Sequence, residues 1–214
     1  MNLDYFKNKE TTLDWIKENI KVYGDTNPLG IDMSVHNPSD SEHSTSPSVF
    51  LTLVLDHKNN IKDLNKINYF IETGTCSGIS SMSFATVIDQ VHTVDVRPWD
   101  DYKNIKERYS NINFWEGDST KFLETLLPTI PDERCVFLLD AHDGTHIVPI
   151  KEEIELIKTL SNVKDHIIIV DDCVDCGAGN FPTLETIHKC ILDINPDYKF
   201  IDGGNIRRTH IAYV

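Results

Sequence analysis

Residues 68–81 have the types and spacing to hold a charged ligand. They read Asn-Tyr-Phe-Ile-Glu-Thr-Gly-Thr-Cys-Ser-Gly-Ile-Ser-Ser, an apolar run that passes through Glu72 into a turn with Gly74 and Gly78. Glycine lets a backbone approach a ligand where a Cβ atom would clash, and a helix that begins after Gly78 would present free N–H groups. An acid at this place repels a pyrophosphate but suits a cation. The segment predicts a nucleotide-type site for a cationic ligand, and it lacks the middle glycine of a dehydrogenase G-x-G-x-x-G fingerprint.

Two more acids follow apolar runs further along the chain. Asp95 ends the segment Val-His-Thr-Val-Asp, and Asp118 lies in Trp-Glu-Gly-Asp-Ser, which ends at Ser119. A carboxylate in the position of Asp95 can accept two hydrogen bonds from ribose hydroxyls, and Asp118 can accept one from an adenine amino group. Each acid alone is a weak signal, whereas their order and spacing behind the glycine turn together favour an adenosine site.

The elements that would position these residues follow a regular pattern. Helical-length segments, one of them at 149–160, separate five apolar runs, which predicts βαβ units and a parallel sheet. The runs lie at 67–72, 91–96, 112–115, 134–139 and 166–170. Residues 198–214 read instead as an antiparallel hairpin that closes the sheet.

The first 60 residues have a different character. Residues 11–23 predict an amphipathic helix, and residues 48–57 are apolar on all sides and predict a buried helix. Between them, residues 25–47 are rich in proline, serine and other polar types without helical or strand periodicity, which is typical of a lid or a disordered loop.

Composition limits the class of protein. A chain of 214 residues with 40% apolar content predicts one domain, and its formal charge of −14 argues against a nucleic acid or an anionic membrane as partner. The sequence has no signal-peptide pattern and no run near the roughly 18 apolar residues of a membrane span, so we expect a cytoplasmic location. The five cysteines are expected to be reduced. A zinc or redox role for Cys173 and Cys176 is disfavoured because no second ligand pair follows.

With these motifs in view, the chain from about Asn68 onward resembles the class I S-adenosylmethionine-dependent methyltransferases. The resemblance implies an α/β fold, with a Rossmann-like seven-stranded mixed sheet, a reversed C-terminal β-hairpin and helices on both faces. It implies a cofactor-binding domain at 61–214, with 1–60 as a helical segment and lid-like loop of the same domain. It places the cofactor, S-adenosylmethionine, against Glu72, Gly74, Thr75, Ser77, Gly78, Asp95, Asp118 and Ser119.

Two further apolar runs end in acids, at Asp140 and at Asp171-Asp172. In the strand order of the methyltransferases these runs are neighbours about 5 Å apart, and carboxylates so close repel each other unless a cation neutralises them. Mg²⁺ or another divalent cation is the expected occupant. The arrangement is similar to metal-dependent O-methyltransferases of the catechol type and of the macrocin type that modifies sugars. The alternative is that Asp140 caps a turn and the pair is solvated.

A base is also needed, because a sugar hydroxyl ionises far above neutral pH. His142, two residues after Asp140, is the first candidate, with Asp143 and His146 behind it. A structural histidine is the alternative for His142.

These residues together predict an S-adenosylmethionine- and metal-dependent O-methyltransferase acting on a hydroxyl of a sugar or other small polyol. A catechol-like acceptor is the nearest variant. A metal-dependent hydroxylase related to the cephalosporin-modifying type and a non-catalytic S-adenosylmethionine-binding protein are alternatives from other classes. We expect a small-molecule or glycan acceptor as partner, and a homodimer is compatible with the sequence.

Overall fold

A computed structural model describes residues 67–76, 78–97, 102–202 and 209–214. The helices predicted at 11–23 and 48–57 and the loop predicted at 25–47 lie outside the described residues, as does Ser77. They stay predictions, as does the boundary at residues 60 and 61.

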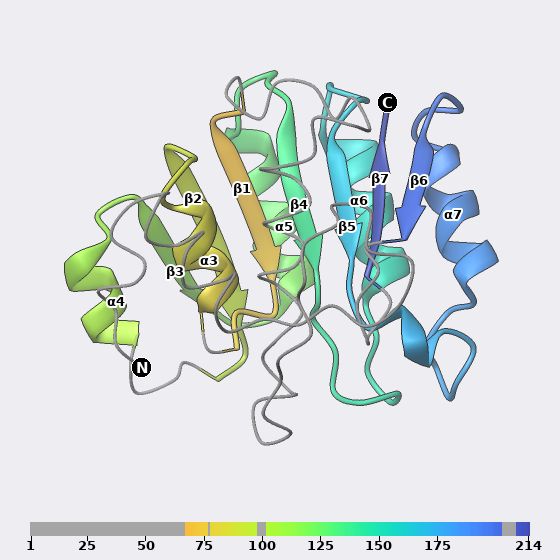
Figure 1. The fold of residues 1–214 in the computed structure, drawn as a ribbon, viewed down its shortest axis with the longest axis horizontal. Helices are drawn as coiled ribbons and strands as arrows, with labels where there is room; N and C mark the ends of the chain where they lie inside the picture. Colours follow the sequence, from red (N-terminus) through yellow and green to blue (C-terminus); the bar gives the residue numbers. More distant parts are fainter. Residues whose placement is uncertain (1–66, 77, 98–101, 203–208) are drawn as a thin grey trace, which may run out of the picture.

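The described residues form a seven-stranded sheet in the order β3-β2-β1-β4-β5-β7-β6 (Figure 1). The five parallel strands are β1 (Tyr69–Thr73), β2 (Gln90–Asp95), β3 (Ile112–Glu116), β4 (Cys135–Leu139) and β5 (Ile167–Val170). Each coincides with one of the predicted apolar runs. Because the five strands are parallel, their carboxyl ends share one edge of the sheet, the lower edge in Figure 1.

The chain closes with an antiparallel hairpin, as the sequence predicted. β6 (Lys199–Asp202) is the outermost strand, and β7 (His210–Tyr213) lies between it and β5, antiparallel to both. No helix among the described residues has the length and apolar character that crossing a bilayer requires.

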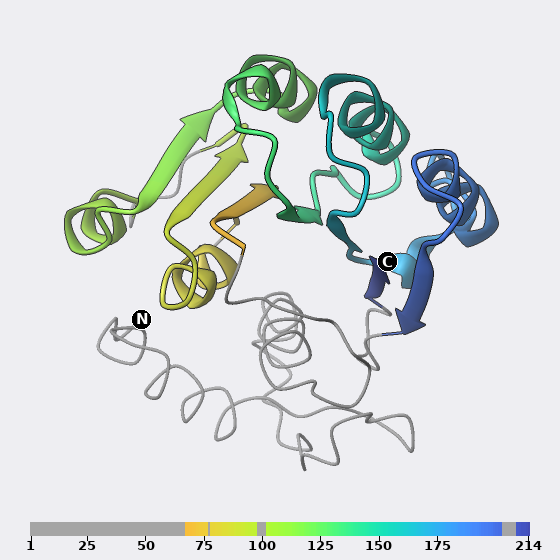
Figure 2. The ribbon, with the colours of Figure 1, turned by 90° about the horizontal axis from the view of Figure 1, so that it is seen from above.

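Helices cover both faces of the sheet, which gives three layers (Figure 2). One face carries α3 (Ile79–Phe84) and α4 (Tyr102–Arg108); the other carries α5 (Ser119–Leu126), α6 (Ile150–Leu160) and α7 (Leu184–Leu192). Two short 3₁₀ helices complete the elements of the described residues, η4 (Leu127–Thr129) and η5 (Cys173–Asp175).

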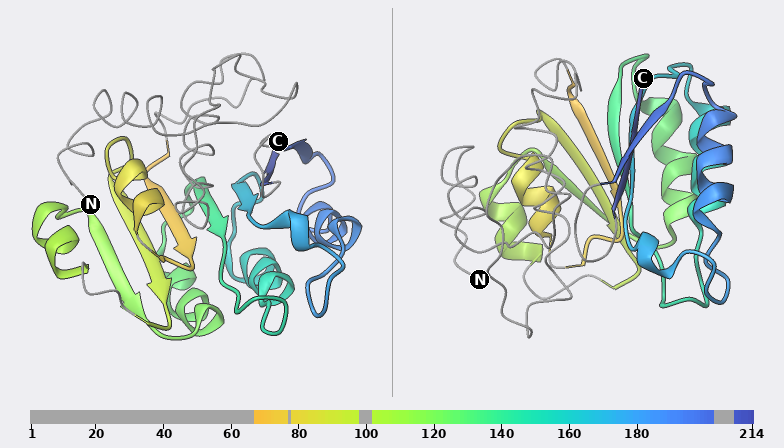
Figure 3. Two further views of the ribbon diagram at one scale, coloured as in Figure 1. Left: turned by 60° about the horizontal axis from the view of Figure 1, so that its bottom comes forward. Right: turned by 45° about the vertical axis from the view of Figure 1, so that its right-hand side comes forward.

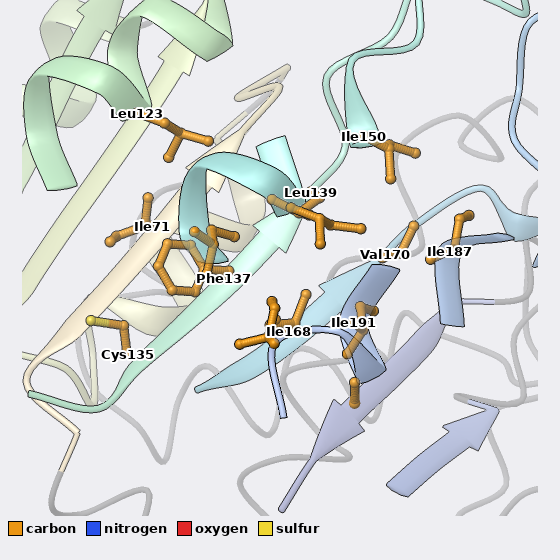
Figure 4. Packing of buried hydrophobic residues seen from close by; sticks show 14 of the residues in the cluster. Ile71, Leu123, Cys135, Phe137, Leu139, Ile150, Ile168, Val170, Ile187 and Ile191 are labelled. Carbon is orange, nitrogen blue, oxygen red and sulfur yellow. The ribbon is translucent and has the colours of Figure 1, made fainter. Parts of the chain in front are cut away.

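The apolar pattern explains the layers. All five residues of β4 and all four of β5 are buried, as expected for central strands covered on both sides. On the face shown in Figure 4, Phe137 and Ile168 pack with Ile150 of α6 and Leu123 of α5. Burial of one such side chain contributes about 1.5–3 kcal/mol. The packed core therefore holds the strand ends in place, and these ends determine where the loops at the lower edge begin.

Candidate functional site

The turn after β1 lies directly against the end of β4. The N–H groups of Gly74 and Thr75 both donate to the carbonyl of Val94, at 2.9 and 3.1 Å. Gly74 has φ +86°, and a Cβ atom there would lie 2.4 Å from the carbonyl oxygen of Asp140. This position requires glycine for its conformation and for its space. The turn predicted to hold the cofactor and the first acid predicted to hold a cation are therefore in backbone contact.

Glu72 lies beneath this turn and is almost completely buried. Its Oε2 accepts hydrogen bonds from Ser81 Oγ at 2.5 Å and from Thr93 Oγ1 at 2.6 Å. Burial raises the pKa of Glu72 to about 7, and these hydrogen bonds oppose the rise. Neither Ser81 nor Thr93 was predicted as a site residue, although a threonine inside a central apolar strand is a signal that was available.

The two acids predicted to bind the adenosine also have partners within the chain. The carboxylate of Asp95 accepts from the N–H groups of Cys76 at 2.9 Å and Arg97 at 3.0 Å. Asp118 is the N-cap of α5, where it accepts from the Lys121 N–H at 3.0 Å, and its hydrogen bonds, first with Thr120, lower the pKa of Asp118. Their roles toward ribose and adenine, and that of the neighbouring Ser119, stay predictions.

β4 and β5 lie side by side and end at the same edge of the sheet (Figure 3, left), and a compact group of possible metal ligands follows these two strands. One ligand atom each from Asp140, His142 and Asp172 lie within 4.8 Å of one another. His142 Nε2 is 2.8 Å from Asp172 Oδ2 and 3.6 Å from Asp140 Oδ1. The hydrogen bond with Asp172 raises the pKa of His142.

The hydrogen-bond partners of His142 define what this group can bind. His142 Nδ1 lies 3.1 Å from the carbonyl oxygen of Gly144, which only accepts, so Nδ1 carries a proton. In the neutral ring Nε2 then presents a lone pair to two carboxylates. A proton or a cation is needed between these three electron-rich atoms.

This group differs from the predicted one in one ligand. Asp171 is buried and its Oδ1 accepts a hydrogen bond from the Thr209 hydroxyl, so it is not a member of the group. The residue after it, Asp172, has φ +51°, which turns the chain so that the two neighbouring acids point to different partners. His142, predicted as the base, takes the third place. Asp143 and His146 are exposed on the same loop, and neither belongs to the group.

The sequence did not identify Glu153, which is fully buried in the first turn of α6. The hydroxyls of Ser119 and Thr73 lie close to its carboxyl group, yet neither oxygen of Glu153 completes a hydrogen bond of good geometry among the described residues. Burial raises the pKa of Glu153 to about 7. An acidic residue on the buried face of an amphipathic helix is the sequence signal that could have found it.

Replacing Glu153 with glutamine is expected to flatten the dependence of stability on pH. An acid whose pKa is raised in the folded state stabilises the protein while it stays protonated. That stability is lost as pH rises from the unfolded value of about 4.5 to about 7, by roughly 1–3 kcal/mol. Glu72 has the same sign and remains in the variant. Urea unfolding at pH 5 and pH 8 should give a smaller difference in free energy for Glu153→Gln than for the wild type.

The neighbouring exposed acid supplies the control. Glu152→Gln removes the same charge from the same helix turn and should reduce the pH dependence of unfolding only slightly, because the charge of Glu152 is the smallest of the causes that raise the pKa of Glu153. Equal pH dependence in the wild type and Glu153→Gln would show that Glu153 keeps its ordinary pKa.

Comparison with known proteins gives structural neighbours only. No protein-family model and no curated protein matches the chain. A suspected O-methyltransferase from Klebsiella pneumoniae is 15% identical with a TM-score of 0.52, over 94% of this chain and 89% of that one. Fibrillarin from Aeropyrum pernix, solved with natively bound S-adenosylmethionine, is 15% identical with a TM-score of 0.54, over 77% and 74%. A suspected O-methyltransferase from Nostoc punctiforme is 12% identical with a TM-score of 0.51, over 80% of this chain and 58% of that one. At these identities the likeness establishes the fold, and the chain has the seven-stranded Rossmann-like fold of the class I methyltransferases.

Proposed function

We propose that this protein is an S-adenosylmethionine-dependent O-methyltransferase that uses a divalent cation to methylate a hydroxyl of a sugar or other small polyol. The observation that carries the proposal is the meeting of two half-sites at one edge of the sheet. The glycine turn after β1 touches the backbone of Asp140, and Asp140 belongs to the group with His142 and Asp172. A methyl donor at the turn and a hydroxyl acceptor at the ligand group would therefore lie next to each other, as methyl transfer requires.

The residues present fit a divalent cation. Two carboxylates and the Nε2 atom of His142 form a compact donor set once a cation replaces the proton at Nε2, and the Gly144 carbonyl orients the ring as ligating histidines require. A cation bound there would lower the pKa of an acceptor hydroxyl and hold its oxygen in line with the donor methyl group.

The residues around Glu72 support S-adenosylmethionine as the methyl donor. This cofactor would supply an activated methyl group on a sulfonium centre. Glu72 and Asp95 bring negative charge to the turn, and Asp95 holds the Cys76 N–H in place. Fibrillarin, a protein of the same fold, binds this cofactor. In this proposal the residues of the turn bind the positively charged cofactor, and Asp95 orients the turn for it.

Two exposed apolar side chains favour a second candidate acceptor. Ile147 is 64% exposed in the loop after β4, and Val174 is 54% exposed in η5, two residues after Asp172. Such side chains suit the flat face of a catechol-like ring better than a bare sugar. With His142 in the cation group, Asp143 and His146 are the exposed groups of this loop that can take the proton from either acceptor.

Calorimetry and a transfer assay test the function. We expect the protein to bind S-adenosylmethionine, and methyl transfer to a panel of deoxysugars, glycans and catechols to require Mg²⁺ or Mn²⁺ and to stop with EDTA. Failure to bind the cofactor would remove the methyltransferase proposal. Transfer that continues at full rate in EDTA would remove the cation, and transfer to catechols alone would establish the second candidate.

A further inference from the structure

A chain of hydroxyl groups connects the turn after β1 to the buried acid beneath it. Thr75 Oγ1 lies 2.5 Å from Thr93 Oγ1, and Thr93 Oγ1 donates to Glu72 Oε2 at 2.6 Å. Ser81 Oγ donates to the same carboxylate oxygen at 2.5 Å. All four side chains are buried. These contacts run from inside the sheet to the turn at its edge.

The number of protons on these groups gives the chain a direction. Each hydroxyl has one proton to donate, and the carboxylate of Glu72 only accepts. Since Thr93 donates to Glu72, Thr75 must donate to Thr93 across their 2.5 Å contact. The Thr75 oxygen then has only lone pairs left to offer. It can accept from a ligand, or from the Tyr102 hydroxyl that lies near it, but has no proton to give to a ligand.

We propose that Thr93 is a positioning residue of the cofactor site, which holds the Thr75 hydroxyl so that the turn accepts hydrogen bonds from the amino group of the cofactor. The proposal rests on the proposed function and deepens it at the same site. Thr93 lies in the interior of β2 and acts only through Thr75 and Glu72. A cationic amino group matches an acceptor that is connected to a carboxylate, whereas a hydrogen-bond acceptor on the ligand would meet no proton.

The charge of Glu72 controls the direction of this chain. Below pH 7 a protonated Glu72 can donate to Thr93 and reverse the order of donors. The groups that face Glu72 are Ser80 and Ser81 from α3, Thr93 and Asp95 from β2, and Tyr102 from α4. The hydroxyls favour the ionised form, and Asp95 opposes it. Cofactor affinity should therefore increase from pH 5.5 to 7.5, a window in which a free α-amino group stays mostly protonated.

The test compares two threonine variants by calorimetry. Thr93→Val keeps the shape but removes the hydroxyl, and should weaken S-adenosylmethionine binding about tenfold, since a buried acceptor loses its partner. Thr93→Ser keeps the hydroxyl and should stay within about threefold of the wild type. Thr93→Val should also lose the rise of affinity with pH, because the charge of Glu72 is no longer connected to the Thr75 hydroxyl. Thermal melting confirms that each variant is folded.

Two controls separate this effect from a loss of packing. Ser83→Ala removes a buried hydroxyl of α3 that donates to the Ile79 carbonyl, outside the chain of hydroxyls, and should bind the cofactor as the wild type does. 5′-Methylthioadenosine lacks the amino acid part of the cofactor, so Thr93→Val should bind it with unchanged affinity. If the chain of hydroxyl groups acts as a unit, Thr75→Val and the double variant Thr75→Val/Thr93→Val should lose about as much cofactor affinity as Thr93→Val.

The outcomes distinguish this inference from the proposed function. Equal cofactor affinity in the wild type and Thr93→Val, or additive losses in the double variant, would overturn the role of Thr93 and leave the methyltransferase proposal standing. Equal weakening of cofactor and 5′-methylthioadenosine would overturn it too, since that result reports packing. A wild-type protein that binds no S-adenosylmethionine would overturn the proposed function and this inference with it.

Discussion

Asp172→Asn is expected to lower cation-dependent methyl transfer roughly 100- to 1,000-fold, the scale seen when one preorganised electrostatic contact is removed from an active site. The carboxylate of Asp172 lies 2.8 Å from His142 Nε2 and is buried, so an amide there loses the negative charge without room to rearrange. S-Adenosylmethionine affinity should stay within a few-fold of the wild type. A single-turnover assay measures the transfer rate, calorimetry measures S-adenosylmethionine affinity, and titration with Mn²⁺ measures the loss of cation binding.

Two neighbouring acids make this prediction specific. Asp175→Asn makes the same change of charge at the end of η5, outside the ligand group, and should leave Mn²⁺ binding unchanged. Asp171→Asn should cost stability through Thr209 more than it costs Mn²⁺ affinity. Full transfer by Asp172→Asn would rule out the proposed cation site. Loss of Mn²⁺ binding in Asp171→Asn alone would instead return the assignment to the pair predicted from the sequence.

Gly74→Ala is expected to destabilise the protein by about 3–5 kcal/mol, a large effect for one methyl group. The added Cβ would lie 2.4 Å from the Asp140 carbonyl oxygen and 2.7 Å from its carbon, and both belong to the backbone. The left-handed conformation at φ +86° adds a further cost for any residue with a side chain. Urea unfolding measures the loss.

Gly144→Ala is the matched comparison. Gly144 also has positive φ, +55°, but no atom lies within 4 Å of the Cβ position. This variant should lose only the conformational part, about 1–2 kcal/mol. Similar losses in the two variants would mean that strain at φ, and not the contact with Asp140, decides the requirement for glycine at position 74.

The positions of the strands along the chain were largely predictable from the sequence. The continuous apolar runs of β4 and β5 have a direct physical cause, since a strand buried on both faces has no polar side. The closing hairpin followed from its turn residues and from its position after the last parallel strand. The strand order itself came from resemblance to a known family, because nothing local in β1 specifies that β4 lies beside it.

The composition of the candidate site was only partly predictable. The sequence brought Asp140 and Asp172 together, but it could not separate Asp172 from Asp171, because that depends on one left-handed residue at the end of β5. His142 was selected as a base for its chemistry, and the structure places its ring between two carboxylates, which also makes it a candidate ligand. Glu153 and Thr93 were missed because an apolar pattern along one strand or helix does not reveal which residue of another element a buried polar side chain meets.

The pKa values near 7 of Glu72 and Glu153 have a consequence for the protein as a whole. The formal charge of −14 counts both acids as ionised, although each is half protonated close to neutrality. One lies on the α3 side of the sheet and the other on the α6 side, so the sheet separates them. The interior of this protein therefore acts as a small buffer, which exchanges up to two protons with its surroundings over the range of pH found in living cells.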